Sequence, residues 1–224
     1  MTDLDHACPA PYPVSDATRL KRHPERGSYD RAVVHAILDE ALVCHLAYAH
    51  GAHVFAMPTT FARDGETLYV HGARANRSLD ALTSGAPFSV TVTLLDGLVF
   101  ARSAFHHSMN YRSVVITGRA REVLERVEKR DAMRRLVDRL SPDRDATLRP
   151  MHDWELESTR VIAIEIEHAS AKVRQGGPIE SLDDIAHPAW AGVVPLRLVA
   201  GAPVAEAHAR DATVPTLAPA LALG

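Results

Sequence analysis

The chain has 224 residues, of which 46% are hydrophobic and 24% charged, as is typical of a globular protein with one large domain or two small ones. Its net charge of −3 and the lack of any apolar run near the roughly 20 residues that span a bilayer predict no nucleic-acid or membrane partner. Two cysteines, Cys8 and Cys44, are too few for a disulfide framework, and the acidic N-terminus does not resemble a signal peptide. We therefore expect a cytoplasmic protein.

The first part of the chain predicts an arm and then a helix. Residues 1–27 are rich in proline with mixed charge and no sustained period, so we expect a flexible N-terminal arm. Asp30 is placed to cap a helix, because apolar residues follow it at helical spacing. These residues are Val33, Val34, Ile37, Leu38 and Ala41.

Residues 42–72 contain three short strand patterns. They are separated at residues 50–51 and 64–65, where His-Gly and Asp-Gly are typical of hairpin turns. Pro58 lies within the second pattern and predicts an edge strand or a bulge, because proline donates no hydrogen bond to a sheet. A short helix is expected over residues 78–84, stopped by glycine and proline.

The second half predicts three longer strands and one helix. Residues 88–95 alternate between apolar and polar, residues 111–123 form a long strand pattern, and residues 160–167 place three isoleucines on one side. A helix before Pro142 carries one apolar face, formed by Ala132, Met133, Leu136, Val137 and Leu140.

Six or so strands joined mainly by hairpins predict a mainly β fold, a six-stranded antiparallel barrel with a few flanking helices. We expect this barrel to occupy residues 28–200 and to be followed by an Ala/Pro-rich tail, residues 201–224.

The stretch "LYVHGARANRSLDAL", residues 68–82, passes from a strand into a helix. Gly72 permits a tight turn, Asn76 or Ser78 can cap the helix, and the free N–H groups at a helix start attract anions. Arg77 adds a forked donor that suits phosphate, with Arg74 nearby. Two interpretations stay open here, an anion site and a solvated turn.

A second polar cluster is "HHSMNYRSV", residues 106–114. Its histidines match none of the common metal-ligand spacings, so no metal site is predicted. The cluster suits either a ligand-binding rim of the barrel or an ordinary loop. The sequence also has no GxSxG, GxGxxG or GxxxxGK[ST] motif, which argues against a nucleophile elbow and against common nucleotide-binding loops.

Four stretches carry a family resemblance between about Arg31 and about Pro178: "ILDEALVCHLAY", "PTTFARDGETLYVHGARANRSLDAL", "VTVTLLDGLVFARSAFHHSMNYRSVVITGRAREV" and "ASAKVRQGGP". In order and spacing they resemble the pyridoxamine 5′-phosphate oxidase-like flavoproteins, which have an FMN-binding split β-barrel. They are most similar to the nitroimidazole-resistance and flavin-nucleotide-binding branch of that family.

The resemblance implies a homodimer with two FMN molecules at the subunit interface. It places Met57, Pro58, Thr59 and Thr60 along the isoalloxazine ring, His71 beside the flavin or substrate, and Arg77 and Ser78 at the phosphate. It also implies that Tyr111, Arg112 and Ser113 approach the flavin from the other subunit, and that Lys172 and Arg174 lie in a late strand that lines the site.

Two departures from the family pattern matter. Many relatives have Arg-Lys where this chain has Arg77-Ser78, and the Arg-x-His motif with which true pyridoxamine phosphate oxidases hold their substrate has no match. We therefore predict no vitamin B6 synthesis.

The leading hypothesis is an FMN-dependent oxidoreductase that acts on a small molecule, with NAD(P)H as a candidate electron donor. His71 is its candidate proton donor, or else a contact to the cofactor alone. The alternative is a non-catalytic FMN- or haem-binding protein of the same fold.

Overall fold

The computed structural model describes residues 9–209 and 214–219, so Cys8 and the outer parts of the expected arm and tail lie outside the described residues. Within these ranges nine strands form one antiparallel sheet: β1 (Gly27–Ser28), β2 (Val43–His50), β3 (His53–Thr60), β4 (Ala62–Asp64), β5 (Thr67–Ala73), β6 (Phe88–Phe100), β7 (Ser108–Glu122), β8 (Thr159–Arg174) and β9 (Gly192–Pro195). The main order is β3-β2-β6-β7-β8-β5-β4, with β1 paired to β8 and β9 paired to β6.

This topology confirms the predicted mainly β, antiparallel split barrel. Among the described residues β3 and β4 end the sheet and do not pair with each other, so the barrel is open. The sheet has nine strands rather than six because β1, β4 and β9 span two to four residues each, too few to show an alternating pattern. Pro58 lies in the edge strand β3, as its lack of an N–H predicted.

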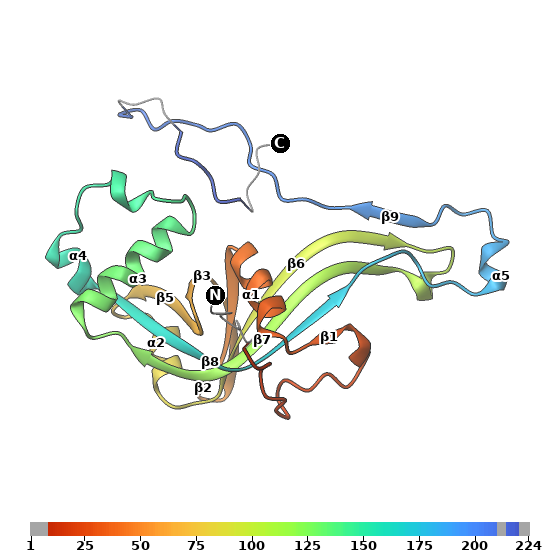
Figure 1. The fold of residues 1–224 in the computed structure, drawn as a ribbon, viewed down its shortest axis with the longest axis horizontal. Coiled ribbons are helices and arrows are strands. Elements are labelled where there is room, and N and C mark those ends of the chain that lie inside the picture. Colours follow the sequence, from red (N-terminus) through yellow and green to blue (C-terminus); the bar gives the residue numbers. More distant parts are fainter. Residues whose placement is uncertain (1–8, 210–213, 220–224) are drawn as a thin grey trace, which may run out of the picture.

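In the part of the chain that the structure describes, five helices accompany the sheet: α1 (Arg31–Glu40), α2 (Arg77–Thr83), α3 (Arg126–Asp138), α4 (Asp153–Ser158) and α5 (Leu182–Ile185). Short 3-10 turns lie at Pro24–Arg26, Ala104–His106 and Asp145–Thr147. Asp30 caps α1 as expected, since its carboxylate accepts from the N–H of Ala32 at 2.7 Å. Figure 1 shows α3 and α4 at one end of the sheet, and α5 with β9 at the other. Within the described residues, no helix has the length and apolar character needed to cross a membrane.

Side-chain alternation divides the core into two layers. Leu68 and Val70 of β5 belong to the main core beneath α1, together with the three isoleucines of β8. Tyr69 points to the opposite face, where it meets Ala132 of α3 in a smaller cluster. Residues two apart on a strand share a face, so β5 also directs His71 toward α3.

Tyr12 ties the N-terminal segment to the barrel. Its side chain is 2% exposed, and its hydroxyl donates to the Glu66 carboxylate and lies 3.0 Å from Nε2 of His35. The Arg31 guanidinium covers the ring at 4.1 Å and pairs with Glu66 at 2.6 Å. This part of the expected arm therefore packs against the barrel, which its proline-rich composition did not indicate; the boundary at residue 27 stays a prediction.

We expect Tyr12→Phe to lower the free energy of unfolding by about 1–2 kcal/mol at pH 7, because it removes a hydrogen bond to a charged group and keeps the buried ring. Burial raises the pKa of Glu66, but hydrogen bonds from Tyr12 and Arg31 and the charge of His35 outweigh it, so the net pKa lies below the usual 4.5. This stabilisation is thus present above pH 4.5 and is lost as the pH falls below it. Urea unfolding at pH 7 and pH 3.5 checks this; an equal loss at both would contradict it.

Candidate functional site

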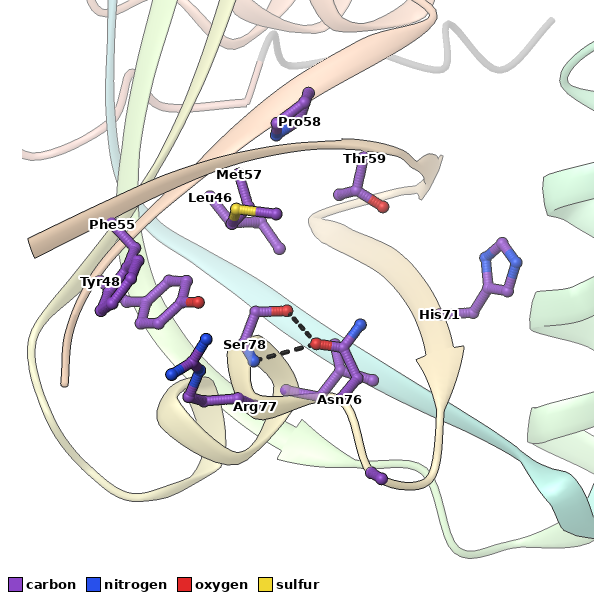
Figure 2. Close-up of a pocket in the computed structure, with 12 residues that line it drawn as sticks. Leu46, Tyr48, Phe55, Met57, Pro58, Thr59, His71, Asn76, Arg77 and Ser78 are labelled. Atoms are coloured by element: carbon purple, nitrogen blue, oxygen red, sulfur yellow. Dashed lines mark hydrogen bonds between the residues drawn. The ribbon is translucent and has the colours of Figure 1, made fainter.

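A cavity of about 550 Å³ lies between β2, β3, the end of β5 and the start of α2, and we call it the α2 pocket (Figure 2). Tyr48 of β2 and Phe55 of β3 stack at one end of it, with ring centroids 5.5 Å apart. Met57, Pro58 and Thr59 continue the wall along β3. The next residue, Thr60, lines a different cavity, so the expected run from Met57 to Thr60 is divided between two pockets.

The turn between β5 and α2 has its conformation fixed by Asn76. Its amide oxygen accepts from the backbone N–H of Ser78 at 3.0 Å and from the Ser78 hydroxyl at 2.6 Å, so Asn76 is the cap. A Cβ on Gly72 would lie 2.7 Å from Nδ2 of Asn76, so a larger residue there would push against the capping side chain. The Ser78 N–H already donates to Asn76, and α2, with only seven residues, has a weak dipole. The attraction of an anion to this turn therefore depends on side chains.

Arg77 supplies that positive charge. Its guanidinium carbon lies 5.1 Å from the centre of the Phe55 ring, and Figure 2 shows the side chain facing Tyr48 across the pocket. Arg160 pairs with Asp80 and Glu122, whereas Arg77 forms no ion pair with any described residue. The α2 pocket thus offers an aromatic wall and an unneutralised cation, which suits a planar, anionic ligand.

A second cavity, also of about 550 Å³, lies between β5, α3 and a segment near the C-terminus, and we call it the α3 pocket. Its apolar walls are formed by Met133, Leu136, Val137, Leu140, Leu148, Pro215 and Leu217. The tail reaches this pocket because the N–H of Ala218 donates to the carbonyl of Leu140 at 3.0 Å. The sequence did not predict the α3 pocket, because the apolar face of this helix has the spacing of a helix packed against a core.

His71 lines both pockets. Its Nδ1 is buried and has no hydrogen-bond partner among the described residues, which is rare for a buried nitrogen. Burial also lowers the pKa of the imidazole, so the ring is neutral at pH 7 and has a free lone pair. Figure 2 shows the ring directed away from Ser78 and toward α3. An unpartnered, neutral imidazole beside an apolar cavity is suited to ligate a metal ion that is itself held within a larger apolar cofactor.

A bare metal site is not formed by the described residues, since no three histidine, cysteine, aspartate or glutamate side chains come together there. Cys44 lies in the main core, where burial raises the pKa of its thiol to about 12. In the group His106–Ser113, Nε2 of His106 lies 3.7 Å from the Asp184 carboxylate. The group lines neither described pocket.

The expected residues of β7 and β8 lie together but away from both pockets. Tyr111 pairs with Arg174 across the strands, and Ser113 pairs with Lys172. Three of these side chains already have partners. Arg174 donates to the carbonyl of Gly177 at 3.1 Å, the Lys172 ammonium to the carbonyl of Arg22 at 3.0 Å, and the Ser113 hydroxyl to the carbonyl of Lys172 at 3.3 Å.

Arg112 is neutralised by two carboxylates. It donates to Glu40 at 2.7 Å and to Asp96 at 2.7 and 2.9 Å, and these bonds raise its already high pKa. A role for Tyr111, Arg112, Ser113, Lys172 and Arg174 toward a flavin of another subunit stays a prediction.

A family model and two solved structures agree on the family of this chain. Residues 30–173 match the model of the pyridoxamine 5′-phosphate oxidase family. The flavocytochrome Anf3 from Azotobacter vinelandii is 38% identical, with a TM-score of 0.86 over 94% of this chain and 98% of that chain. The FAD and haem binding protein from Mycobacterium smegmatis is 36% identical, with a TM-score of 0.80 over 87% and 95%. No curated protein matches the chain.

A candidate 5-nitroimidazole antibiotic resistance protein from Bacteroides thetaiotaomicron shares the fold, with a TM-score of 0.57 at 18% identity over 66% of this chain and 86% of that chain. The matched residues run from the cap of α1 to the end of β8 and include the α2 pocket and His71. The chain therefore belongs to the pyridoxamine 5′-phosphate oxidase-like family of flavin-binding split β-barrel proteins.

Proposed function

We propose that this protein is an oxidoreductase that binds a flavin in the α2 pocket and a haem in the α3 pocket. The observation that carries the proposal is His71, which lines both pockets and whose Nδ1 is buried without a hydrogen-bond partner among the described residues. Support comes from the two relatives above 35% identity, one a flavocytochrome and the other an FAD and haem binding protein, which this chain matches over nearly their whole length.

The α2 pocket fits the flavin. Arg77 offers two-pronged hydrogen bonding to a phosphate, and Phe55 and Tyr48 provide an aromatic edge. The family resemblance favours FMN and one relative binds FAD; both carry a phosphate that suits Arg77. Met57 and Thr59 would border the ring system, as the family resemblance implies.

The α3 pocket fits a haem. A neutral imidazole is a common axial ligand of haem iron, and His71 needs no rearrangement of hydrogen bonds to act as one. The apolar side chains of α3 and of the C-terminal segment would exclude water from the macrocycle. When bound, a flavin supplies one- and two-electron chemistry and a haem supplies one-electron chemistry at iron. His71 would hold the two sites next to each other.

We further propose a homodimer. β3 is an edge strand with exposed side chains, among them Val54 at 81%, and the same strand borders the α2 pocket. A second copy that covered β3 would close this pocket and protect the unpaired edge. Sedimentation of the flavin-loaded protein tests this: a monomer that retains flavin would refute it.

The absorption spectrum of the purified protein tests the main proposal. We expect flavin bands and a Soret band together, with extraction and chromatography identifying FMN or FAD, and anaerobic addition of NADH or NADPH reducing both groups. Protein that takes up flavin but no haem would overturn the haem assignment. Two bound cofactors that no donor reduces would favour the non-catalytic carrier.

A further inference from the structure

The α3 pocket is apolar except at a few points. Thr60, His71, Ser141 and Arg144 are its polar lining residues, and Arg144 is the one fixed charge among the described residues that line it. A single cation in an apolar cavity predicts a ligand with an apolar body and an anionic group, because a charge with no counter-charge is costly beside apolar surface.

Arg144 is held at the pocket by the turn that follows α3. Asp143 adopts a left-handed conformation, with φ of 58°, and the N–H of Arg144 then donates to the carbonyl of Ser141 at 3.1 Å. The Arg144 guanidinium donates once, through Nη1 to the hydroxyl of Thr147 at 3.1 Å. No carboxylate among the described residues pairs with it, so most of its five N–H donors are free for a ligand.

The neighbouring Arg135 and Arg139, in contrast, have partners in the barrel or at the end of α1. Arg135 pairs with Asp64 at 2.9 Å, and Arg139 donates to the backbone carbonyls of Leu38 and Ala41 at 3.2 and 2.6 Å. Those two side chains hold α3 against the barrel. Arg144 has no such partner in the barrel, so its position at the cavity calls for another explanation.

The pocket also has an inner and an outer part. Nδ1 of His71 is buried, whereas Leu140 and Leu148 are 46% and 42% exposed. Half-exposed leucines around a cavity indicate a surface that a ligand would cover. Haem matches this arrangement, because its iron lies within an apolar macrocycle that carries carboxylate groups at one edge.

We propose that Arg144 binds a carboxylate of the haem, so that the ligand is held by its iron at His71 and by its acidic edge at Arg144. This inference rests on the proposed function and adds the residue that orients the haem in its pocket. Arg144 is a binding residue here and takes no part in redox chemistry. A guanidinium is suited to this task because its paired N–H groups match the two oxygens of a carboxylate.

The test compares haemin with haemin dimethyl ester, in which both carboxylates are blocked. Haem-free full-length protein is titrated with each, and binding is followed by the Soret band. We expect wild-type protein to favour haemin by about tenfold, the effect of one charge-assisted hydrogen bond. Arg144→Gln should weaken haemin binding by about the same factor and bring the preference close to one, while Arg144→Lys should retain part of it.

Arg134→Gln is the matched control. Arg134 lies on α3, the helix that precedes Arg144, with Asp131 and Asp138 as its weak partners. It does not line the pocket, so the preference for haemin should be unchanged. Circular dichroism confirms that each variant is folded. Haemin binding in Arg144→Gln with an unchanged preference over the ester would overturn the inference and leave the proposed function intact. Failure of wild-type protein to bind haemin would overturn both.

Discussion

His71→Ala is expected to abolish the Soret band of the purified protein while flavin affinity changes by less than about threefold, under 1 kcal/mol. The variant removes the only imidazole that lines the α3 pocket among the described residues, and with it the proposed ligand for iron. In the proposed function the flavin is held by Arg77 and the aromatic wall instead. The measurement is the ratio of Soret to flavin absorbance in protein reconstituted with both cofactors.

A control variant, a rescue by free imidazole and a stability measurement test this expectation further. His208→Ala, at an exposed histidine, should keep the normal spectrum. Free imidazole should restore a Soret band in His71→Ala, because it can enter the space that the side chain leaves. Stability should not fall in the cofactor-free state, since Nδ1 has no partner to lose and its burial costs about 1–3 kcal/mol. A normal Soret band in His71→Ala would show that another residue ligates the iron.

Arg77→Ala should raise the dissociation constant of FMN or FAD by about 10- to 100-fold, corresponding to the roughly 1.5–3 kcal/mol of hydrogen bonds to a charged group. The loss should be confined to ligands that carry phosphate. Riboflavin has the same ring without the phosphate, so its affinity should be the same in wild-type protein and in Arg77→Ala. Fluorescence quenching of each flavin on titration with apoprotein provides the measurement.

Arg74→Ala is the control for a lost charge in the same turn. Arg74 donates to the carbonyl of Glu157 at 3.0 Å and does not line the α2 pocket, so its removal should leave flavin binding unchanged. Equal losses in the two variants would indicate a general electrostatic effect. An equal loss for riboflavin and FMN in Arg77→Ala would place Arg77 beside the ring system instead of the phosphate.

Local patterns in the sequence predicted most of the fold. The isoleucines of β8 lie in the main core as their alternation required, and so do Val90 and Val92 of β6. Asp30 caps α1 as predicted. At the turn before α2 the sequence left two caps open, and the structure selects Asn76. These features depend on residues close together in the chain, where spacing carries the information.

The α3 pocket shows what the sequence could not provide. Met133, Val137 and Leu140 have the spacing of a core-facing helix, and only the three-dimensional arrangement leaves a cavity between them and His71. Leu217 contributes to that cavity although it lies 77 positions after Leu140, in the Ala/Pro-rich tail to which the sequence assigned no role. The missing hydrogen bond of His71 likewise depends on which groups surround it in space, and no pattern within β5 could reveal it.

One side chain borders two cavities, and this has a thermodynamic consequence. A ligand in the α3 pocket that fixes the imidazole of His71 also fixes part of the wall of the α2 pocket. If binding of one ligand orders this shared wall, the second ligand binds more favourably by the same free energy. The effect is equal in both directions because linkage between two binding sites is reciprocal. Loading with one cofactor should therefore change the affinity for the second by the same factor in either order of addition.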